Sequence, residues 1–324
     1  MRRGISSAVA IVAVAAISMT AVLATRHGEQ APRPAQETRA SDLVLLVVRT
    51  PPGPLAAVIG TAGATTPAGV AIPAGLLITI PGQGEGKAAD VLTSGPSGAV
   101  AVSNLLGTWV DHRGTTDLQH LAAVVDRAGG IEVSGIARTG TQVSASLRRK
   151  GPGQLLQWQQ VLAGLLASRA RWEPGDFTDA DSVEDVSRLL ETAGPLTVGV
   201  LPTKVSAGGI EEPDYDAIAE LMLSTFGAPA RDVIPVIVLN GSGTPGVGEG
   251  VAGAIVPGGF RVVLSGNASS FDHAETLIVV GGSGDPAIAE RVRDLLGVGR
   301  VTVSGPASGI ADVTVIVGKD FRTA

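Results

Sequence analysis

The side chains of this 324-residue chain that could act on an anionic substrate are a few isolated cations. Arg148 and Arg149 stand together in the stretch LRRK, residues 147–150, and Lys87 stands alone after the stretch PGQGEG. Adjacent guanidinium groups can bind phosphate oxygens through paired hydrogen bonds. A solvated surface has the same composition, so the residues alone leave both interpretations open.

A glycine pattern in the second half of the chain resembles a nucleotide-binding loop. In NGSGTPG, residues 240–246, three glycines match G-x-G-x-x-G, a pattern that brings backbone N–H groups to a pyrophosphate. Pro245 interrupts this pattern, and the next expected strand ends at Asn267 where an acidic residue would be needed for a ribose hydroxyl. The pattern therefore favours a tight β-to-α turn over a dinucleotide site, and a ligand or partner loop is one role open to such a turn.

Metal and thiol chemistry have little support in the sequence. There is no cysteine, which excludes disulfides, iron–sulfur clusters and thiolate zinc sites. The four histidines lack the spacing of zinc ligands. The acidic stretch FTDADSVEDV, residues 177–186, lacks the glycine and the terminal glutamate of a calcium loop, so it is more typical of a helix start.

The overall charge and composition limit the classes of partner. The formal net charge is −6, which argues against broad nucleic-acid binding, because that needs clustered cations. Apolar residues make up 44% of the chain but aromatic residues only 3%, so the cores must consist mainly of Val, Leu, Ile and Ala. The abundance of Ala, Gly, Val and Arg suggests a GC-rich, actinobacteria-like bacterial genome.

The N-terminus predicts a membrane anchor. Arg2 and Arg3 precede an uncharged run of 21 residues, Gly4–Ala24, long enough to span the roughly 30 Å hydrocarbon layer. Basic residues before the run favour a cytoplasmic N-terminus. We expect a single-pass anchor over 1–25 in the cell membrane, a polar linker over 26–40, and the remaining domains outside. A cleaved signal peptide is the alternative.

After the linker, strands alternate with helices, which predicts an α/β layered domain with a mixed sheet over residues 41–227. Apolar β-rich runs indicate strands, and apolar residues at helical spacing indicate helices. The expected strands are 43–50, 55–63, 76–82, 131–135 and 195–203, and the expected helices are 115–130, 153–172, 178–194 and 211–227.

A second pattern begins after a short joint and predicts a small α+β domain over residues 234–324. Its elements are expected in the order β-α-β-β-α-β with one further strand. This order resembles the split βαβ arrangement of small two-layer domains.

Taken together, the segments resemble the LytR–CpsA–Psr (LCP) family followed by its LytR-type C-terminal domain. SDLVLLVV, residues 41–48, is similar to the strand that opens with a metal-associated aspartate, here Asp42. IPAGLLITIPGQGEGKAAD, residues 72–90, is similar to the family's Ile-Pro-Arg-Asp strand, its turn and its Lys-led helix, here Lys87. The most specific match is 105–133, which reproduces a succession of family positions: Asp111, His112, Asp117, Asp126, Gly129 and Gly130.

The resemblance implies a membrane-anchored extracytoplasmic protein of a Gram-positive bacterium. Active members of the family transfer glycopolymers from a polyprenyl-pyrophosphate lipid to peptidoglycan, with the help of Mg²⁺. That chemistry needs cations aimed at the phosphates and carboxylates that hold the metal.

The sequence departs from the family at these charges. No counterpart of the family's first strand and its Asp-x-Arg is found. Neutral residues occupy the positions of an Arg-Asp pair, of a later acid and of an Arg-x-x-Arg pair: Ala74, Gly75, Gly151, Gln154 and Gln157. The remnants are Asp42, as a magnesium ligand, with Lys87, Arg148 and Arg149.

The sequence therefore predicts a degenerate, non-catalytic envelope protein without a required cofactor. Its expected partners are the membrane and a wall glycopolymer, a polyprenyl-linked precursor, peptidoglycan or an active family member. One alternative is an active phosphotransferase that uses Mg²⁺ and the four remnants in a rearranged site. Another is a purely structural module that docks onto an envelope protein. A transcriptional regulator is disfavoured, because the chain is acidic and has no helix-turn-helix signature.

Overall fold

The computed structural model describes residues 42–62, 66–151, 153–191, 198–228, 233–281, 284–304 and 309–323. The anchor predicted over 1–25 and the linker predicted over 26–40 lie outside these ranges. Within them, no helix combines the length and the apolar character needed to cross a membrane.

The first part of the described chain is built on a mixed sheet, as predicted. Its strand order is β10-β3-β2-β1-β6-β9. Strand β1 (Leu43–Arg49) pairs antiparallel with β2 (Leu55–Ala62) and parallel with β6 (His112–Asp117). Strand β3 (Thr66–Ile72) continues the sheet antiparallel to β2, with β10 (Val198–Val200) parallel to β3 and β9 (Asp179–Ala180) antiparallel to β6.

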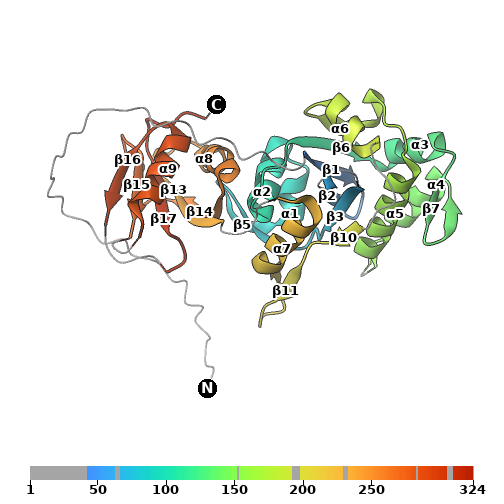
Figure 1. Cartoon of the computed structure of the whole chain (residues 1–324), viewed down its shortest axis with the longest axis horizontal. Coiled ribbons are helices and arrows are strands. Elements are labelled where there is room, and N and C mark those ends of the chain that lie inside the picture. The colour runs from blue at the N-terminus through green and yellow to red at the C-terminus, as the bar shows by residue number, and fades with distance from the viewer. Residues whose placement is uncertain are drawn as a thin grey trace, which may run out of the picture. The chain divides into compact units, whose positions relative to one another are not determined.

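Strand β1 lies at the centre of two cores, one on each face of this sheet. Its residues from Leu43 to Val48 are all buried, because alternate side chains point to opposite faces and both faces are covered. Figure 1 shows the two groups of helices on the two sides of the sheet. One face carries α3 (Leu118–Arg127), α4 (Gly140–Leu147), α5 (Gln154–Ser168) and α6 (Val183–Glu191), and the other carries α1 (Ala88–Leu92), α2 (Pro96–Leu106) and α7 (Tyr215–Phe226).

Three hairpins and a short 3-10 helix complete this part. The hairpin that joins the sheet to α1 consists of β4 (Leu77–Ile80) and β5 (Gly84–Lys87). The other elements are β7 (Ile131–Val133) with β8 (Ile136–Arg138), β11 (Thr203–Val205) with β12 (Glu211–Pro213), and η1 (Pro174–Asp176).

The helix predicted over 115–130 begins later than expected. Residues 112–117 form β6 instead, because Thr115 and Thr116 are buried in the parallel pairing with β1. Asp117 then accepts hydrogen bonds from the backbone of Gln119 and His120 and starts α3. The helix ends at Arg127, and Gly129 and Gly130 follow with φ of 78° and 99°, which L side chains rarely adopt.

The second sheet has the predicted element order but a different pairing. The elements are β13 (Ile234–Asn240), α8 (Val247–Ile255), η2 (Val256–Gly258), β14 (Phe260–Asn267), β15 (Leu277–Val280), α9 (Pro286–Leu296), β16 (Arg300–Val303) and β17 (Val313–Val317). The strand order is β14-β13-β17-β15-β16.

The split βαβ arrangement predicted for this sheet is therefore wrong. The two strands of each βαβ unit, β13 with β14 and β15 with β16, are direct parallel neighbours. The last strand, β17, enters between the two units, parallel to β13 and antiparallel to β15. The order of elements along the chain does not determine the position of β17 in the sheet. This apolar strand could be buried between the two βαβ units, as observed, or at another position in the sheet.

Candidate functional site

The turn that should carry the family's Arg-Asp pair is intact in its backbone. The carbonyl oxygens of Ala74 and Leu76 accept hydrogen bonds from the N–H groups of Ala89 and Ala88, both at 2.9 Å. These bonds hold the turn against the start of α1, next to the exposed Lys87. Gly75 is exposed, and a Cβ added there would meet no atom within 4 Å. Packing therefore does not exclude a charged side chain at this position; the sequence lacks one.

Asp42 lies at the opposite end of the sheet from this turn. The end of β3, at Ile72, is level with Ala56 and Val47, whereas Leu43 pairs with Gly60 near the other end of β2. Asp42 precedes Val47 by five residues, which at about 3.3 Å per residue is roughly 16 Å along the strand. Asp42 and the turn that contains Ala74 and Gly75, next to Lys87, therefore lie too far apart along the sheet to act on the same phosphate group.

Arg148 and Arg149 lie on the other face of the sheet from Lys87. Both are exposed and follow Leu147, which is buried in the core beneath α3 to α6. Lys87 precedes Ala88, which is buried in the core beneath α1, α2 and α7. Among the described residues, no hydrogen bond or ion pair joins any two of Asp42, Lys87, Arg148 and Arg149.

The donor set around Asp42 does not fit the Mg²⁺ of the family reaction. Such an ion is held by one or two carboxylates together with the substrate phosphates. The nearby Asp111 already accepts a hydrogen bond from the Leu43 N–H at 3.0 Å, and the turn expected to face phosphate lies at the far end of β1. The described ranges also contain no group of three or more His, Asp or Glu side chains arranged to hold a metal ion.

The aspartates of the most specific sequence match bind the backbone of their own domain. Asp111 closes the start of β1 through the Leu43 N–H. Asp126 Oδ1 accepts a hydrogen bond from the Gly140 N–H at 2.7 Å, which joins the end of α3 to the start of α4. With Asp117 at the start of α3, three of the matched acids therefore stabilise the scaffold.

The environment of Asp117 favours its ionised form. Burial opposes ionisation, but hydrogen bonds from the His120 backbone, the His120 ring and the Gln119 backbone outweigh it and hold the pKa of Asp117 below its usual value. The ring Nδ1 of His120 lies 2.9 Å from Asp117 Oδ1. The carboxylate also lies at the positive end of the α3 dipole.

Replacing Asp117 with Ala is expected to lower the free energy of unfolding by about 1 kcal/mol, the usual effect of losing a helix cap. The folded-state pKa is depressed, so this contribution is complete above the ordinary aspartate pKa of about 3.9 and is lost as pH falls through the lower folded value. Urea unfolding of both proteins across the acid range measures it. Asp117→Asn keeps a capping oxygen, so it should remove the pH dependence but retain most of the stability. A wild-type-to-Ala difference that does not change with pH would contradict this account.

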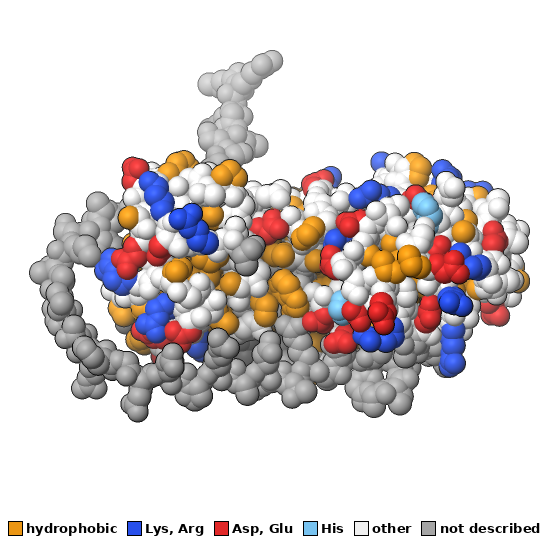
Figure 2. Space-filling view, turned by 90° about the horizontal axis from the view of Figure 1, so that it is seen from above, with side chains coloured by type: hydrophobic (Ala, Val, Ile, Leu, Met, Phe, Trp, Pro, Cys, Tyr) orange, Lys and Arg blue, Asp and Glu red, His pale blue; other side chains and the backbone are white. Residues whose placement is uncertain are grey.

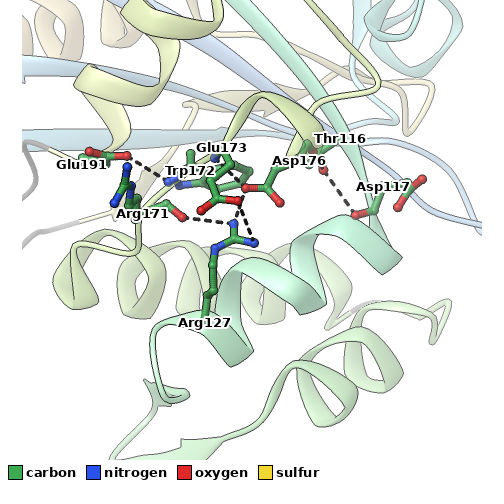
Figure 3. A network of polar contacts seen from close by, with 8 residues as sticks. All are labelled: Thr116, Asp117, Arg127, Arg171, Trp172, Glu173, Asp176 and Glu191. Atoms are coloured by element: carbon green, nitrogen blue, oxygen red, sulfur yellow. Dashed lines mark hydrogen bonds and ion pairs between the residues drawn. The ribbon is translucent and has the colours of Figure 1, made fainter.

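A network that the sequence did not predict joins α3 to the segment 171–176. Figure 3 shows Arg127 reaching from α3 toward Glu173 and Asp176. Asp176 is only 4% exposed, and its carbonyl oxygen accepts a hydrogen bond from Thr116 Oγ1 at 2.6 Å. Its carboxylate also accepts from the Glu173 N–H at 2.7 Å. Because these carboxylates are occupied by an arginine and by backbone groups, the network is structural.

The comparisons with known proteins bear on the second sheet first. Residues 233–321 match the family model LytR_C, described as the LytR cell envelope-related transcriptional attenuator. The C-terminal segment is LytR_C-like. This confirms the resemblance to the LytR-type C-terminal domain inferred from the sequence, whereas the loss of the catalytic motifs stays a prediction. No curated protein matches the chain.

Several solved structures are also similar to the chain. A transcriptional regulator from Enterococcus faecalis is 15% identical, with a TM-score of 0.49, over 59% of this chain and 89% of that one. A LytR-Csp2A-Psr enzyme from Actinomyces oris is 18% identical, with a TM-score of 0.45, over 56% and 92%. TagT from B. subtilis is 16% identical, with a TM-score of 0.47, over 62% and 96%. At these values the likenesses carry no conclusion about function.

The edge strand β14 of the LytR_C-like segment contacts α2, β4 and α7 of the first part of the chain. The side-chain amide of Asn104, in α2, pairs with Val262 in both directions: Nδ2 donates to the carbonyl oxygen at 2.9 Å, and Oδ1 accepts from the N–H at 2.7 Å. Thr79 Oγ1 donates to the Val263 carbonyl at 3.3 Å. The Arg261 guanidinium lies 4.3 Å from the centroid of the Tyr215 ring. These contacts satisfy an edge that would otherwise expose unpaired backbone groups.

Charged side chains of both signs are mixed on one face of the described part of the molecule. On the described part of the face drawn in Figure 2, Lys and Arg side chains alternate with Asp and Glu side chains.

Proposed function

We propose that this chain is an extracytoplasmic protein of the cell envelope that binds a wall glycopolymer and does not transfer it. In this proposal residues 1–25 anchor it in the cytoplasmic membrane as a single span, 26–40 are a linker, 41–227 form a degenerate LCP-like domain, and 234–324 form the LytR-type domain. The envelope assignment is supported by the LytR_C match over 233–321.

The observation that carries the non-catalytic part is the separation of the charged residues. The turn that should face phosphate carries Ala74 and Gly75. The remaining cations, Lys87 and the Arg148–Arg149 pair, belong to layers on opposite faces of the sheet. Transfer from a pyrophosphate needs several cations that converge on one phosphate group. Each such contact stabilises the transition state by several kcal/mol.

The test combines a transfer assay with a binding assay on the purified full-length chain. With a polyprenyl-pyrophosphate-linked glycan, Mg²⁺ and peptidoglycan, we expect no transfer above the protein-free blank, and we expect the chain to sediment with isolated cell walls. Transfer that disappears in Arg148→Ala/Arg149→Ala would establish the alternative, an active phosphotransferase. Failure to sediment with walls would contradict the binding function.

A further inference from the structure

A pocket of about 460 Å³ lies where the β4–β5 hairpin meets the LytR_C-like segment. Its walls are the hairpin turn at 81–83, the loop 240–246 that follows β13, the first turn of α8, and the end of β14 with Phe271. This volume is in the range of sites for small ligands.

The pocket depends on a close backbone approach between the hairpin and α8. A Cβ added at Gly248 would lie 2.7 Å from the Cα of Gly82, and one at Gly82 would lie 3.1 Å from the Glu249 nitrogen. The Gly82 N–H donates a hydrogen bond to Ser265 Oγ at 2.7 Å. Ser97 Oγ, in α2, lies 2.9 and 2.8 Å from the two carboxylate oxygens of Glu249. Both halves of the described chain therefore contribute to one preformed wall.

The loop 240–246 is held in one conformation by its own first residue. Asn240 Oδ1 accepts hydrogen bonds from the N–H groups of Ser242 and Gly243 at 3.1 and 3.0 Å. Asn240 Nδ2 donates to the Thr244 carbonyl at 2.9 Å. An asparagine that bonds its own turn in this way fixes the turn, and a loop fixed before binding loses little entropy when a ligand arrives.

The chemistry of the lining suits an uncharged polar ligand. Among the described residues that form the walls, Glu249 carries the only ionisable side chain, so a phosphate group would meet a negative charge and no cation. Gln83 and Asn267 present exposed amides, which both donate and accept hydrogen bonds. The ring of Phe271 is 48% exposed at the rim.

We propose that this pocket binds a neutral saccharide unit. A sugar ring presents hydroxyl groups around its edge, which match amides and a carboxylate, and apolar C–H groups on its face, which match an exposed aromatic ring. The proposal rests on the proposed function and specifies it: the protein contacts the sugar part of an envelope polymer, and the phosphate part lies elsewhere.

The test measures binding of chitotetraose, a neutral oligosaccharide, to the full chain by calorimetry, with pyrophosphate as the anionic probe. We expect chitotetraose to bind and pyrophosphate not to compete. Phe271→Ala and Gln83→Ala should each weaken chitotetraose binding about tenfold or more. Leu156→Ala, which truncates a 56% exposed leucine on α5, and Gln119→Ala, an exposed amide on α3, are the matched controls and should bind as the wild type does.

The possible outcomes distinguish failure of the proposed saccharide site from failure of the proposed function. Chitotetraose binding that is unchanged in both pocket variants would overturn the site. Absence of chitotetraose binding by a preparation that still sediments with cell walls would overturn the site and leave the proposed function in place. Loss of wall sedimentation by the wild type would overturn both. Competition by pyrophosphate that Phe271→Ala removes would also overturn the proposal, because the pocket would then select an anion.

Discussion

Replacing Asn104 with alanine is expected to lower the free energy of unfolding by about 3 kcal/mol and to separate the unfolding of the two sheets. The substitution removes both hydrogen bonds to Val262, and Asn104 is only 1% exposed, so water does not replace them readily. Each buried backbone group left without a partner costs about 1–3 kcal/mol. The Asn104 carbonyl also accepts from Arg261 Nε at 3.2 Å, and that bond should weaken as the helix shifts.

Differential scanning calorimetry measures this directly. The wild type should unfold in one cooperative transition, and Asn104→Ala in two, because the LytR_C-like segment loses its main polar attachment to α2. Asn267→Ala, an exposed asparagine at the end of the same strand β14, is the matched control and should change stability by less than about 0.5 kcal/mol. A single unshifted transition in Asn104→Ala would show that other contacts hold the two sheets together.

Local sequence patterns predicted the strands and helices well where the burial of apolar side chains alone determines the element. The run from Leu43 to Val48 is continuously apolar, and the strand is buried on both faces, as such a run indicates. The amphipathic segments over 153–172, 178–194 and 211–227 contain α5, α6 and α7. Asp126 and the Gly129–Gly130 turn lie in the stretch with the most specific family resemblance, and both serve the backbone of this chain: Asp126 accepts a hydrogen bond from the Gly140 N–H, and the two glycines have positive φ.

The pairing of strands and the position of the site could not be predicted in the same way. Whether Asp42 lies near the Ala74–Gly75 turn depends on how many strands separate them, and β2 places the two at opposite ends of β1. The location of β17 between two βαβ units depends on contacts far apart in the sequence. The pocket is formed by segments more than 150 residues apart, and only the loop NGSGTPG is a local signal for it in the sequence.

The four remnant residues illustrate the difference between composition and geometry. From the sequence alone, a rearranged phosphate site could be formed by Asp42, Lys87, Arg148 and Arg149. In the structure they occupy two ends and two faces of one sheet. The aspartate and the three cations are therefore separate exposed charges. At the surface, the contribution of each one to an ion pair or to the binding of a phosphate is small.

Replacing Gly140 with alanine is expected to lower the free energy of unfolding by about 3 kcal/mol, within the range of overpacking in a close-packed interior. A Cβ at this position would lie 2.7 Å from the carbonyl carbon of Ala122 and closer still to its oxygen. The obstacle is the backbone of α3, which cannot rotate away as a side chain can. Moving α4 to make room would also stretch the hydrogen bond from the Gly140 N–H to Asp126.

Urea unfolding of Gly140→Ala and of Gly75→Ala separates this contact from the general effect of removing a glycine. Gly75 is the matched control, because a Cβ there has open space and neither glycine has a positive φ. Gly75→Ala should keep or slightly raise stability by restricting the unfolded chain. If Gly140→Ala were equally harmless, α3 and α4 would have to be able to separate at little cost.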